Sequence, residues 1–201
     1  MLAGILPTGC ERGVLNGQVH PGDVVAVIGA GPVGLSAISG TRLFSPSLVV
    51  AIGTAPSRLE AAKQFGADVV VNNAEQDPIA AVRELTDGLG VDVAIEAVGV
   101  PATFELAAEL VRPVGRVADI GVHGKPATLH LERLWARDVT ITTGLVDTYS
   151  TPTLRLLTSH QIDAQRFVSH RFGFDEFMQA YDVFSRAGET GALKCVLSRN
   201  S

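Results

Sequence analysis

The sequence has little charge, few aromatic side chains and no excess of basic residues. Charged residues make up 18% of its 201 residues, below the about 25% usual for globular domains, and aromatic residues make up 5%. Lys and Arg number 16 against 21 Asp and Glu, so the chain lacks the basic surface that nucleic-acid binding requires, and no nucleic-acid partner is expected. The mean hydropathy is +0.27, but no run of about 18 apolar residues occurs, so no membrane span is expected.

Cysteine is also scarce. Cys10 and Cys195 form no Cys-x-x-Cys pair, which argues against a redox site or a structural zinc site and favours a reduced, cytoplasmic setting. Hydrophobic residues make up 46% of the chain, enough for a packed interior. Together with the low charge, this indicates apolar surface that a partner or a further part of the protein covers.

Short apolar, β-branched runs alternate with helical patterns through most of the chain. The predicted strands are residues 24–28, 48–52, 68–71, 91–95, 116–121 and 139–143. Because the runs are apolar throughout, the strands are expected to be buried on both faces. The pattern predicts an α/β fold with a doubly wound parallel sheet, the Rossmann fold.

Proline, glycine and one capping pattern mark the helices between these strands. Ser57 and Glu60 have capping-box spacing, which predicts a helix from Ser57 to Phe65 that Gly66 ends. Pro78 and Pro101 are predicted to open the next two helices.

The pattern changes after Gly144. A short helix is predicted to begin at Thr151, followed by a strand at residues 168–172 and a closing strand at residues 193–197. Between those strands, apolar residues recur at helical spacing, at Phe177, Ala180, Tyr181 and Phe184. This α+β tail has apolar faces that a completed sheet does not obviously cover.

The strongest motif is a glycine-rich turn between the first predicted strand and the first helix. Gly29, Gly31 and Gly34 have Gly-x-Gly-x-x-Gly spacing. The first permits a tight turn, the second leaves space for a pyrophosphate, and the third lets helix and strand approach. We expect Gly29, Gly31, Pro32, Val33 and Gly34 to bind the phosphates of a dinucleotide. A turn without a ligand, and a methyltransferase-type loop that binds a nucleoside, remain alternatives.

The end of the second predicted strand bears on cofactor choice. An acidic residue that binds the ribose hydroxyls is expected about 20 residues after the loop, but the sequence has Gly53 there. Thr54 can donate a hydrogen bond and Arg58 can add positive charge. The cofactor is therefore NAD(P), with NADP modestly favoured, although Arg58 alone would also fit a solvated helix position.

The sequence resembles the zinc-containing alcohol dehydrogenases of the medium-chain dehydrogenase/reductase superfamily, especially the secondary-alcohol and threonine dehydrogenase-like branch. The segments that carry the resemblance are residues 5–9, 21–25, 29–34, 63–67, 90–99 and 121–124. The resemblance implies three parts: a linker at residues 1–20, a dinucleotide-binding Rossmann domain at 21–148, and a C-terminal portion of an incomplete catalytic domain at 149–201.

The resemblance also implies contacts with the cofactor outside the glycine-rich turn: Thr8 at the nicotinamide, Ala97 and Val98 on the adenosine side, Ile120, Gly121 and Val122 at the carboxamide, and Lys194 at the pyrophosphate. Core packing would also account for Val98 and Ile120, and Lys194 is equally consistent with a solvated lysine. His123 follows these residues without an evident acid or base partner, and Glu96 is expected to be an ordinary strand-end group.

Zinc is expected in such a family but not in this chain. The family's first two zinc ligands belong to an N-terminal domain that has no counterpart here, and the position of the remaining ligand is Gly4. The implied activity is hydride transfer between an alcohol and NAD(P), with this chain inactive by itself. The alternative is a non-catalytic dinucleotide-binding module that needs an N-terminal domain partner. A homodimer or higher oligomer is expected through the sheet edge at residues 139–143.

Overall fold

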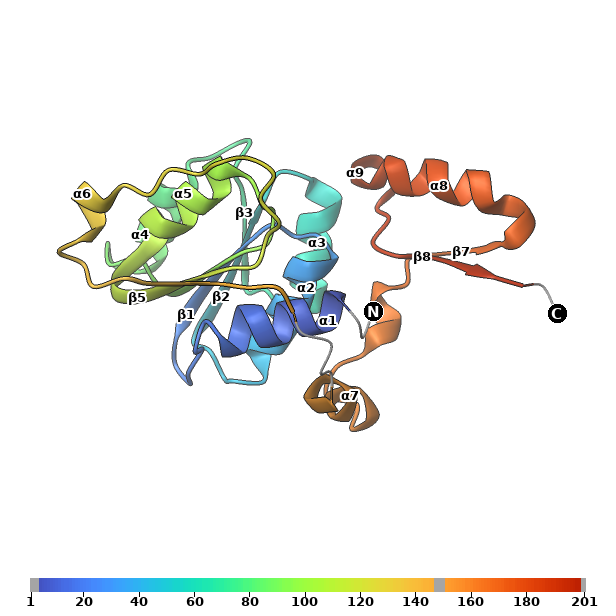
Figure 1. The fold of residues 1–201 in the computed structure, drawn as a ribbon, viewed down its shortest axis with the longest axis horizontal. Helices are drawn as coiled ribbons and strands as arrows, with labels where there is room; N and C mark the ends of the chain where they lie inside the picture. Colours follow the sequence, from blue (N-terminus) through green and yellow to red (C-terminus); the bar gives the residue numbers. More distant parts are fainter. Residues whose placement is uncertain (1–3, 147–150, 200–201) are drawn as a thin grey trace.

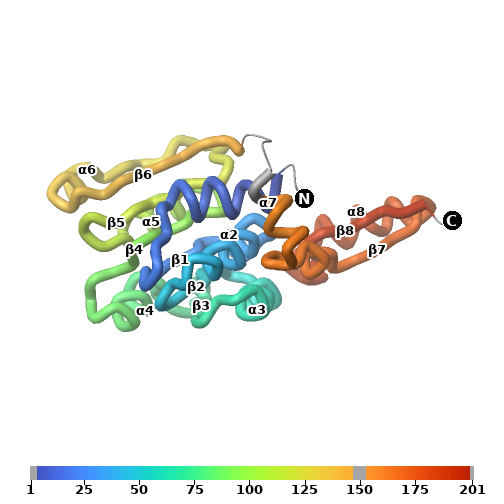
Figure 2. Tube along the Cα trace, turned by 90° about the horizontal axis from the view of Figure 1, so that it is seen from below, coloured from blue at the N-terminus to red at the C-terminus, as the bar shows by residue number. Residues whose placement is uncertain are grey.

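The computed structural model describes residues 4–146 and 151–199. Within this part of the chain, six parallel strands form one sheet in the order β3-β2-β1-β4-β5-β6 (Figures 1 and 2). The strands are β1 (Val24–Ile28), β2 (Leu48–Gly53), β3 (Val69–Asn72), β4 (Val91–Glu96), β5 (Val111–Asp119) and β6 (Thr140–Thr143). The strand order reverses beside β1, which lies between β2 and β4. The predicted Rossmann fold is confirmed, and its topological switch point lies at β1.

Helices cover both faces of the sheet. They are α1 (Ile5–Pro7), η1 (Thr8–Leu15), α2 (Pro32–Arg42), α3 (Pro56–Phe65), α4 (Pro78–Leu85) and α5 (Pro101–Leu110), with the short α6 (Leu131–Leu134) before β6. Buried side chains of α1, η1, α2 and α3 pack on one face, and those of α4 and α5 pack on the other. Each fully buried Val, Leu or Ile contributes about 1.5–3 kcal/mol relative to an exposed one. Residues of the predicted linker, including Leu6 and Val14, therefore belong to the core.

Two local predictions were wrong. The capping box at Ser57 does not form: α3 begins one residue earlier because Pro56 presets the first helical turn, and the Ser57 hydroxyl donates to the Gly188 carbonyl. The fifth strand begins at Val111 instead of residue 116, because Val111 pairs with Val91 before the register shifts. It ends at Asp119 because the amides of Ile120 and Gly121 turn to the Glu96 carbonyl, 2.9 and 3.1 Å away.

The C-terminal unit lies beside the sheet domain and projects from it (Figures 1 and 2). Its elements are α7 (Thr151–Thr158), η2 (Ala164–Phe167), β7 (His170–Gly173), η3 (Phe174–Glu176), α8 (Phe177–Ser185), α9 (Ala187–Thr190) and β8 (Cys195–Ser198). Strands β7 and β8 form a parallel pair, each shifted toward the C-terminus from its predicted range. The rings of Phe65 and Phe167, 4.7 Å apart, join the unit to α3. In residues 4–146 and 151–199, no helix combines the length and apolar character that crossing a membrane requires.

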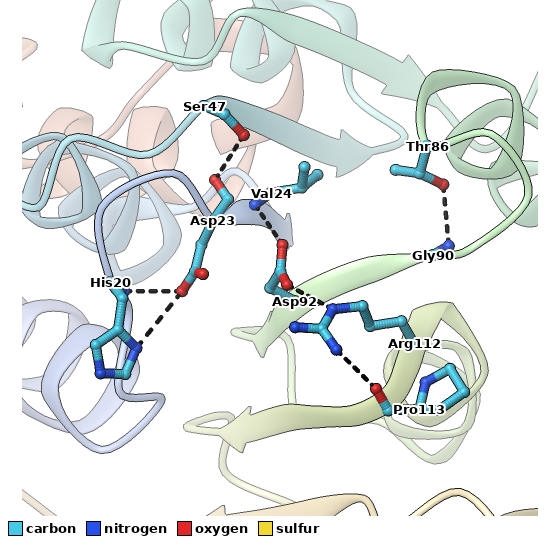
Figure 3. A network of polar contacts seen from close by, with 9 residues as sticks. All are labelled: His20, Asp23, Val24, Ser47, Thr86, Gly90, Asp92, Arg112 and Pro113. Carbon is cyan, nitrogen blue, oxygen red and sulfur yellow. Dashed lines mark hydrogen bonds and ion pairs between the residues drawn. The ribbon is translucent and has the colours of Figure 1, made fainter.

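At the amino ends of the strands, polar groups form hydrogen bonds and ion pairs with one another (Figure 3). Asp92 accepts a hydrogen bond of 2.8 Å from the amide of Val24 and pairs at 2.5 Å with Arg112. Thr86 donates to the Val82 carbonyl and accepts from the amide of Gly90, at 2.8 and 3.0 Å. These side chains tie strand ends and helix ends together.

Candidate functional site

The glycine-rich turn joins β1 to α2 at the carboxyl end of the sheet. Gly29 has a φ of +98°, which glycine adopts without strain. A Cβ on Gly34 would overlap the Gly29 carbonyl oxygen, so this glycine permits the close approach of α2 to β1. A Cβ on Gly31 would have nothing within 4 Å. The backbone at Gly31 therefore faces open space at the N-terminus of α2, where amides and the helix dipole favour an anion.

A cavity of about 310 Å³ opens beside this turn, at the carboxyl ends of β1, β2 and β4. Seven predicted site residues line it: Gly29, Gly31, Gly53, Thr54, Arg58, Ala97 and Val98. The fold therefore gathers residues from three separate βα connections around one space, as a doubly wound sheet does at its switch point.

Two polar atoms at this cavity have no hydrogen-bond partner among the described residues. They are the buried Nε of Arg58 and the buried Oδ1 of Asn73, which follows β3. An unsatisfied buried polar group costs about 1–3 kcal/mol, so such groups call for an explanation. Both residues line the cavity, and a ligand there reaches these atoms only if the side chains turn toward it.

The other predicted site residues do not line the cavity. Pro32, Val33 and Gly34 form the first turn of α2 behind it. Thr8 is half-buried at the start of η1, Ile120 is buried, Gly121 is half-buried, and Val122 is 86% exposed. Lys194 lines a separate hollow under α8 with Phe177 and Tyr181.

Sequence reasoning missed Asn73 and Thr103 at the cavity and underrated Glu96. Thr103 lies in the first turn of α5 and donates a hydrogen bond of 2.7 Å to Glu96 Oε1. Each of the three is a polar residue at or just beyond the carboxyl end of a predicted strand, or in the helix turn that follows. That position was the available signal.

Glu96, the last residue of β4, is fully buried. Burial raises the pKa of its carboxyl group, while hydrogen bonds from Thr103, Gly99 and Val98 oppose the rise. Asp119 lies opposite it on β5, and the Nε2 of His123 is 3.1 Å from Asp119 Oδ1 and 3.7 Å from Glu96 Oε2. His123 therefore has the acidic partners that the sequence did not reveal.

These three side chains are the one group of at least three potential metal ligands in the described residues. Three protein donors occupy Glu96 Oε1, and the amide of Gly99 also reaches Oε2. Gly4, at the predicted zinc-ligand position, has no side chain to offer. The described residues therefore do not fit a zinc site at Gly4.

Comparisons with known proteins match nearly the whole chain. The family model described as zinc-binding dehydrogenase matches residues 32–159. An alcohol dehydrogenase of Cupriavidus necator is 36% identical over 98% of this chain and 55% of its own length. The solved structure of a zinc-dependent alcohol dehydrogenase from Streptococcus pneumoniae has a TM-score of 0.92 at 45% identity, covering 98% of this chain and 57% of that one.

A zinc-binding dehydrogenase from Sinorhizobium meliloti, solved with NADP bound, has a TM-score of 0.85 at 25% identity. The match covers 94% of this chain and 56% of that one. The chain thus spans little more than half the length of the proteins it matches.

Proposed function

The chain belongs to the zinc-binding dehydrogenase family, and from that premise we propose that its carboxyl-end cavity binds a nicotinamide dinucleotide. The observation that carries the proposal is the open space beside Gly31, at the N-terminus of α2. A pyrophosphate placed there accepts hydrogen bonds from backbone amides and faces the positive end of the helix dipole. The similar Sinorhizobium meliloti structure with bound NADP supports the choice of ligand.

The chain's own residues hold and orient the dinucleotide. Gly31 admits the pyrophosphate to the backbone, while Gly53, Thr54 and Arg58 lie where β2 ends, toward the adenosine half. The other half extends toward β4 and β5, on the opposite side of β1. When bound, the nicotinamide ring supplies the acceptor or donor of a hydride.

Cofactor choice is proposed to favour NADP modestly. No carboxylate stands at Gly53 to repel a 2′-phosphate, and the unpartnered Nε of Arg58 can donate to one. The Oδ1 of Asn73, on the same side of the cavity, is an acceptor and suits a ribose hydroxyl, so it does not contribute to this preference. Competition between NAD⁺ and NADP⁺ in titration calorimetry measures the preference.

The binding proposal is tested by calorimetry on the wild type and a Gly31→Val variant. A valine at residue 31 places its side chain in the pyrophosphate space, so dinucleotide affinity should fall at least tenfold, or about 1.4 kcal/mol. Equal dinucleotide affinity of the wild type and the variant would contradict the assignment of this site. S-adenosylmethionine is titrated alongside NAD⁺ and NADP⁺. If the protein binds S-adenosylmethionine and neither dinucleotide, the methyltransferase alternative is favoured.

We further propose that this chain alone neither holds a catalytic zinc nor oxidises alcohols. Gly4 supplies no side chain for the metal, and the alkoxide that develops in hydride transfer needs an electrophile. The test is metal analysis of the purified chain together with reduction of NADP⁺ by a secondary alcohol. Stoichiometric zinc and an ordinary turnover rate would contradict this proposal.

A homodimer through β6 is proposed for the same chain. Strand β6 is the last strand of the sheet, its pairing residues are uncharged, and Ile141 is half-buried. An uncharged edge favours pairing with a second copy. Ile141→Lys should convert a dimer into a monomer by light scattering, whereas an unchanged mass would exclude this edge.

The C-terminal unit favours a second candidate, a dinucleotide-binding module that works with a separate catalytic domain. Along α8, Phe177, Met178 and Tyr181 are 52%, 74% and 66% exposed, which is unusual for a free apolar face. Mixing the chain with an N-terminal domain of a similar dehydrogenase and measuring alcohol oxidation tests this candidate. Gain of activity only in the mixture would support it.

A further inference from the structure

Glu96 is the one acidic or basic residue that is fully buried in the described parts of the chain. Its Oε1 accepts hydrogen bonds from the amides of Val98 and Gly99, at 2.8 and 3.0 Å, and from the hydroxyl of Thr103 at 2.7 Å. These donors belong to the loop after β4 and to the first turn of α5. One carboxyl oxygen therefore fixes the loop of residues 97–100 against α5.

The backbone of Glu96 holds a second segment. Its carbonyl oxygen accepts from the amides of Ile120 and Gly121, at 2.9 and 3.1 Å. A Cβ on Gly121 would overlap Glu96 Oε2, so the chain after β5 passes directly over this carboxyl group. Glu96 thus joins the loop after β4 to the segment after β5.

The loop after β4 also touches the glycine-rich turn. Ala97 and Val98 line the cavity, and a Cβ on Gly29 would lie 2.6 Å from Val98 Cγ2. A Cβ on Gly99 would lie 2.6 Å from the amide nitrogen of Val122. Any shift of residues 97–100 would therefore move both the cavity wall and its contact with Val122.

We propose that Glu96 is a positioning residue for the nicotinamide half of the dinucleotide, through the loop of residues 97–100 and the segment of residues 120–122. The inference rests on the proposed dinucleotide site. Because the pyrophosphate space lies at β1 and the adenosine side at β2, the strand ends of β4 and β5 face the other half of the ligand. This placement of the loop after β4 differs from the adenosine contact that the resemblance implies for Ala97 and Val98. Glu96 acts there through backbone groups that it holds.

The geometry distinguishes two substitutions of Glu96. Gln keeps an oxygen that accepts from Val98, Gly99 and Thr103, and its amide can donate to Asp119, so the loop should stay in place. Leu has a similar size but leaves those donors unpaired, so the loop should rearrange to find water.

The test compares each dinucleotide with the same molecule lacking the nicotinamide ring. These pairs are NAD⁺ with ADP-ribose and NADP⁺ with 2′-phospho-ADP-ribose, measured by calorimetry. Glu96→Leu should weaken dinucleotide binding about tenfold or more. Binding of the ring-free molecule should fall by a factor at least about threefold smaller, since Ala97 and Val98 also line the cavity that it occupies. Glu96→Gln should stay within about threefold of the wild type for both ligands.

Asp92→Leu is the matched control, because Asp92 is also a carboxylate at an end of β4 that holds a backbone amide, but at the opposite edge of the sheet. It should not alter the difference between dinucleotide and ring-free ligand. Thr103→Val removes one hydrogen-bond donor to Glu96 and is the second test variant in case Glu96→Leu does not fold. It should lower the affinity for the dinucleotide about threefold or more relative to that for the ring-free molecule.

Equal losses for both ligands in Glu96→Leu or Thr103→Val would overturn the inference, because a merely structural role moves both. No loss in either variant, or the same selective loss in Asp92→Leu, would overturn it too. A wild-type protein that binds neither molecule of either pair would instead refute the proposed function.

Discussion

The two ends of the six-stranded sheet differ in how their polar groups are satisfied. At the amino end, Asp92 pairs with the amide of Val24 and with Arg112, and Thr86 accepts from the amide of Gly90 (Figure 3). Thr86 also donates to the Val82 carbonyl. At the carboxyl end, the Nε of Arg58 and the Oδ1 of Asn73 are buried at a cavity without a partner. Among the described residues, the amino end also has one buried atom without a partner, the Oγ1 of Thr41, but only the carboxyl end combines such groups with a cavity.

This difference indicates that the amino end contributes mainly to stability and the carboxyl end mainly to ligand binding. The paired donors and acceptors at the amino end stabilise the fold and are not available to a ligand. The carboxyl end gives up some of that stabilisation, since its glycines leave space and its unpaired groups are desolvated. Substitutions at the amino end should therefore change the free energy of unfolding, and those at the open cavity should change ligand affinity.

The largest effect is expected at Gly34, away from the cavity, where α2 packs against the turn that follows β1. Gly34→Ala puts a Cβ into the Gly29 carbonyl oxygen, so either the turn or α2 must move. We expect loss of about 3 kcal/mol or more of unfolding free energy, or no folded protein, in urea denaturation. Gly124→Ala is the control, since a Cβ there meets nothing within 4 Å. An unchanged denaturation midpoint for Gly34→Ala would contradict the close approach.

The next effect concerns Gly53, in the open part of the same end. A Cβ at Gly53 lies 3.4 Å from Leu59 Cδ2, an ordinary contact, so Asp fits without distorting β2. Gly53→Asp should shift the ratio of NAD⁺ to NADP⁺ affinity toward NAD⁺ by about tenfold, because a carboxylate accepts from ribose hydroxyls and repels a 2′-phosphate.

Gly53→Asn is the matched control for charge, because it has the same shape without the negative charge. If both variants shift the ratio alike, repulsion of the 2′-phosphate is not the cause. A wild type that already prefers NAD⁺ by about tenfold would contradict the proposed preference for NADP.

A smaller effect is expected at the amino end. Thr86→Val removes the hydrogen bonds to Val82 and from Gly90, so the free energy of unfolding should fall by about 1–2 kcal/mol. Dinucleotide affinity should remain within about twofold in calorimetry. A larger change in affinity would show that the two ends are coupled and would break the comparison.

Sequence predicted the sheet and the glycine-rich turn because both depend on local pattern. Uninterrupted apolar runs specify strands buried on both faces, and fixed glycine spacing specifies the turn between β1 and α2. What sequence missed depends on contacts between distant residues. The Ser57 hydroxyl donates to Gly188, 131 residues away, so no local capping pattern could reveal its partner.

The candidate site was predicted in part for the same reason. Gly31 and Gly53 follow from their spacing along the chain, and both line the cavity. Asn73 and the cluster of Glu96, Asp119 and His123 depend on the sheet register, which sets Glu96 opposite Asp119. Before the register is known, each of these is a polar residue near a strand end and nothing more.

The smallest effect is a pH dependence at Glu96. Burial raises the pKa of its carboxyl group above the ordinary 4.5, so the folded protein holds this proton more tightly than the unfolded chain does. The stabilisation by the neutral carboxyl group is therefore fully present below about pH 4.5 and is lost as pH rises through the folded-state pKa. Glu96→Gln resembles the neutral carboxyl group and does not titrate.

The unfolding free energy of the wild type should thus fall relative to that of Glu96→Gln as pH rises above about 4.5. Asp119 and His123 face Glu96 from the β5 side, and Thr103 faces it from α5, so both proteins are measured with these groups intact. Urea denaturation at a series of pH values gives the difference. A difference that stays constant, or grows in favour of the wild type with rising pH, would show that Glu96 is charged in the folded protein throughout this range. The loop of residues 97–100 would then be held by a carboxylate instead of a neutral carboxyl group.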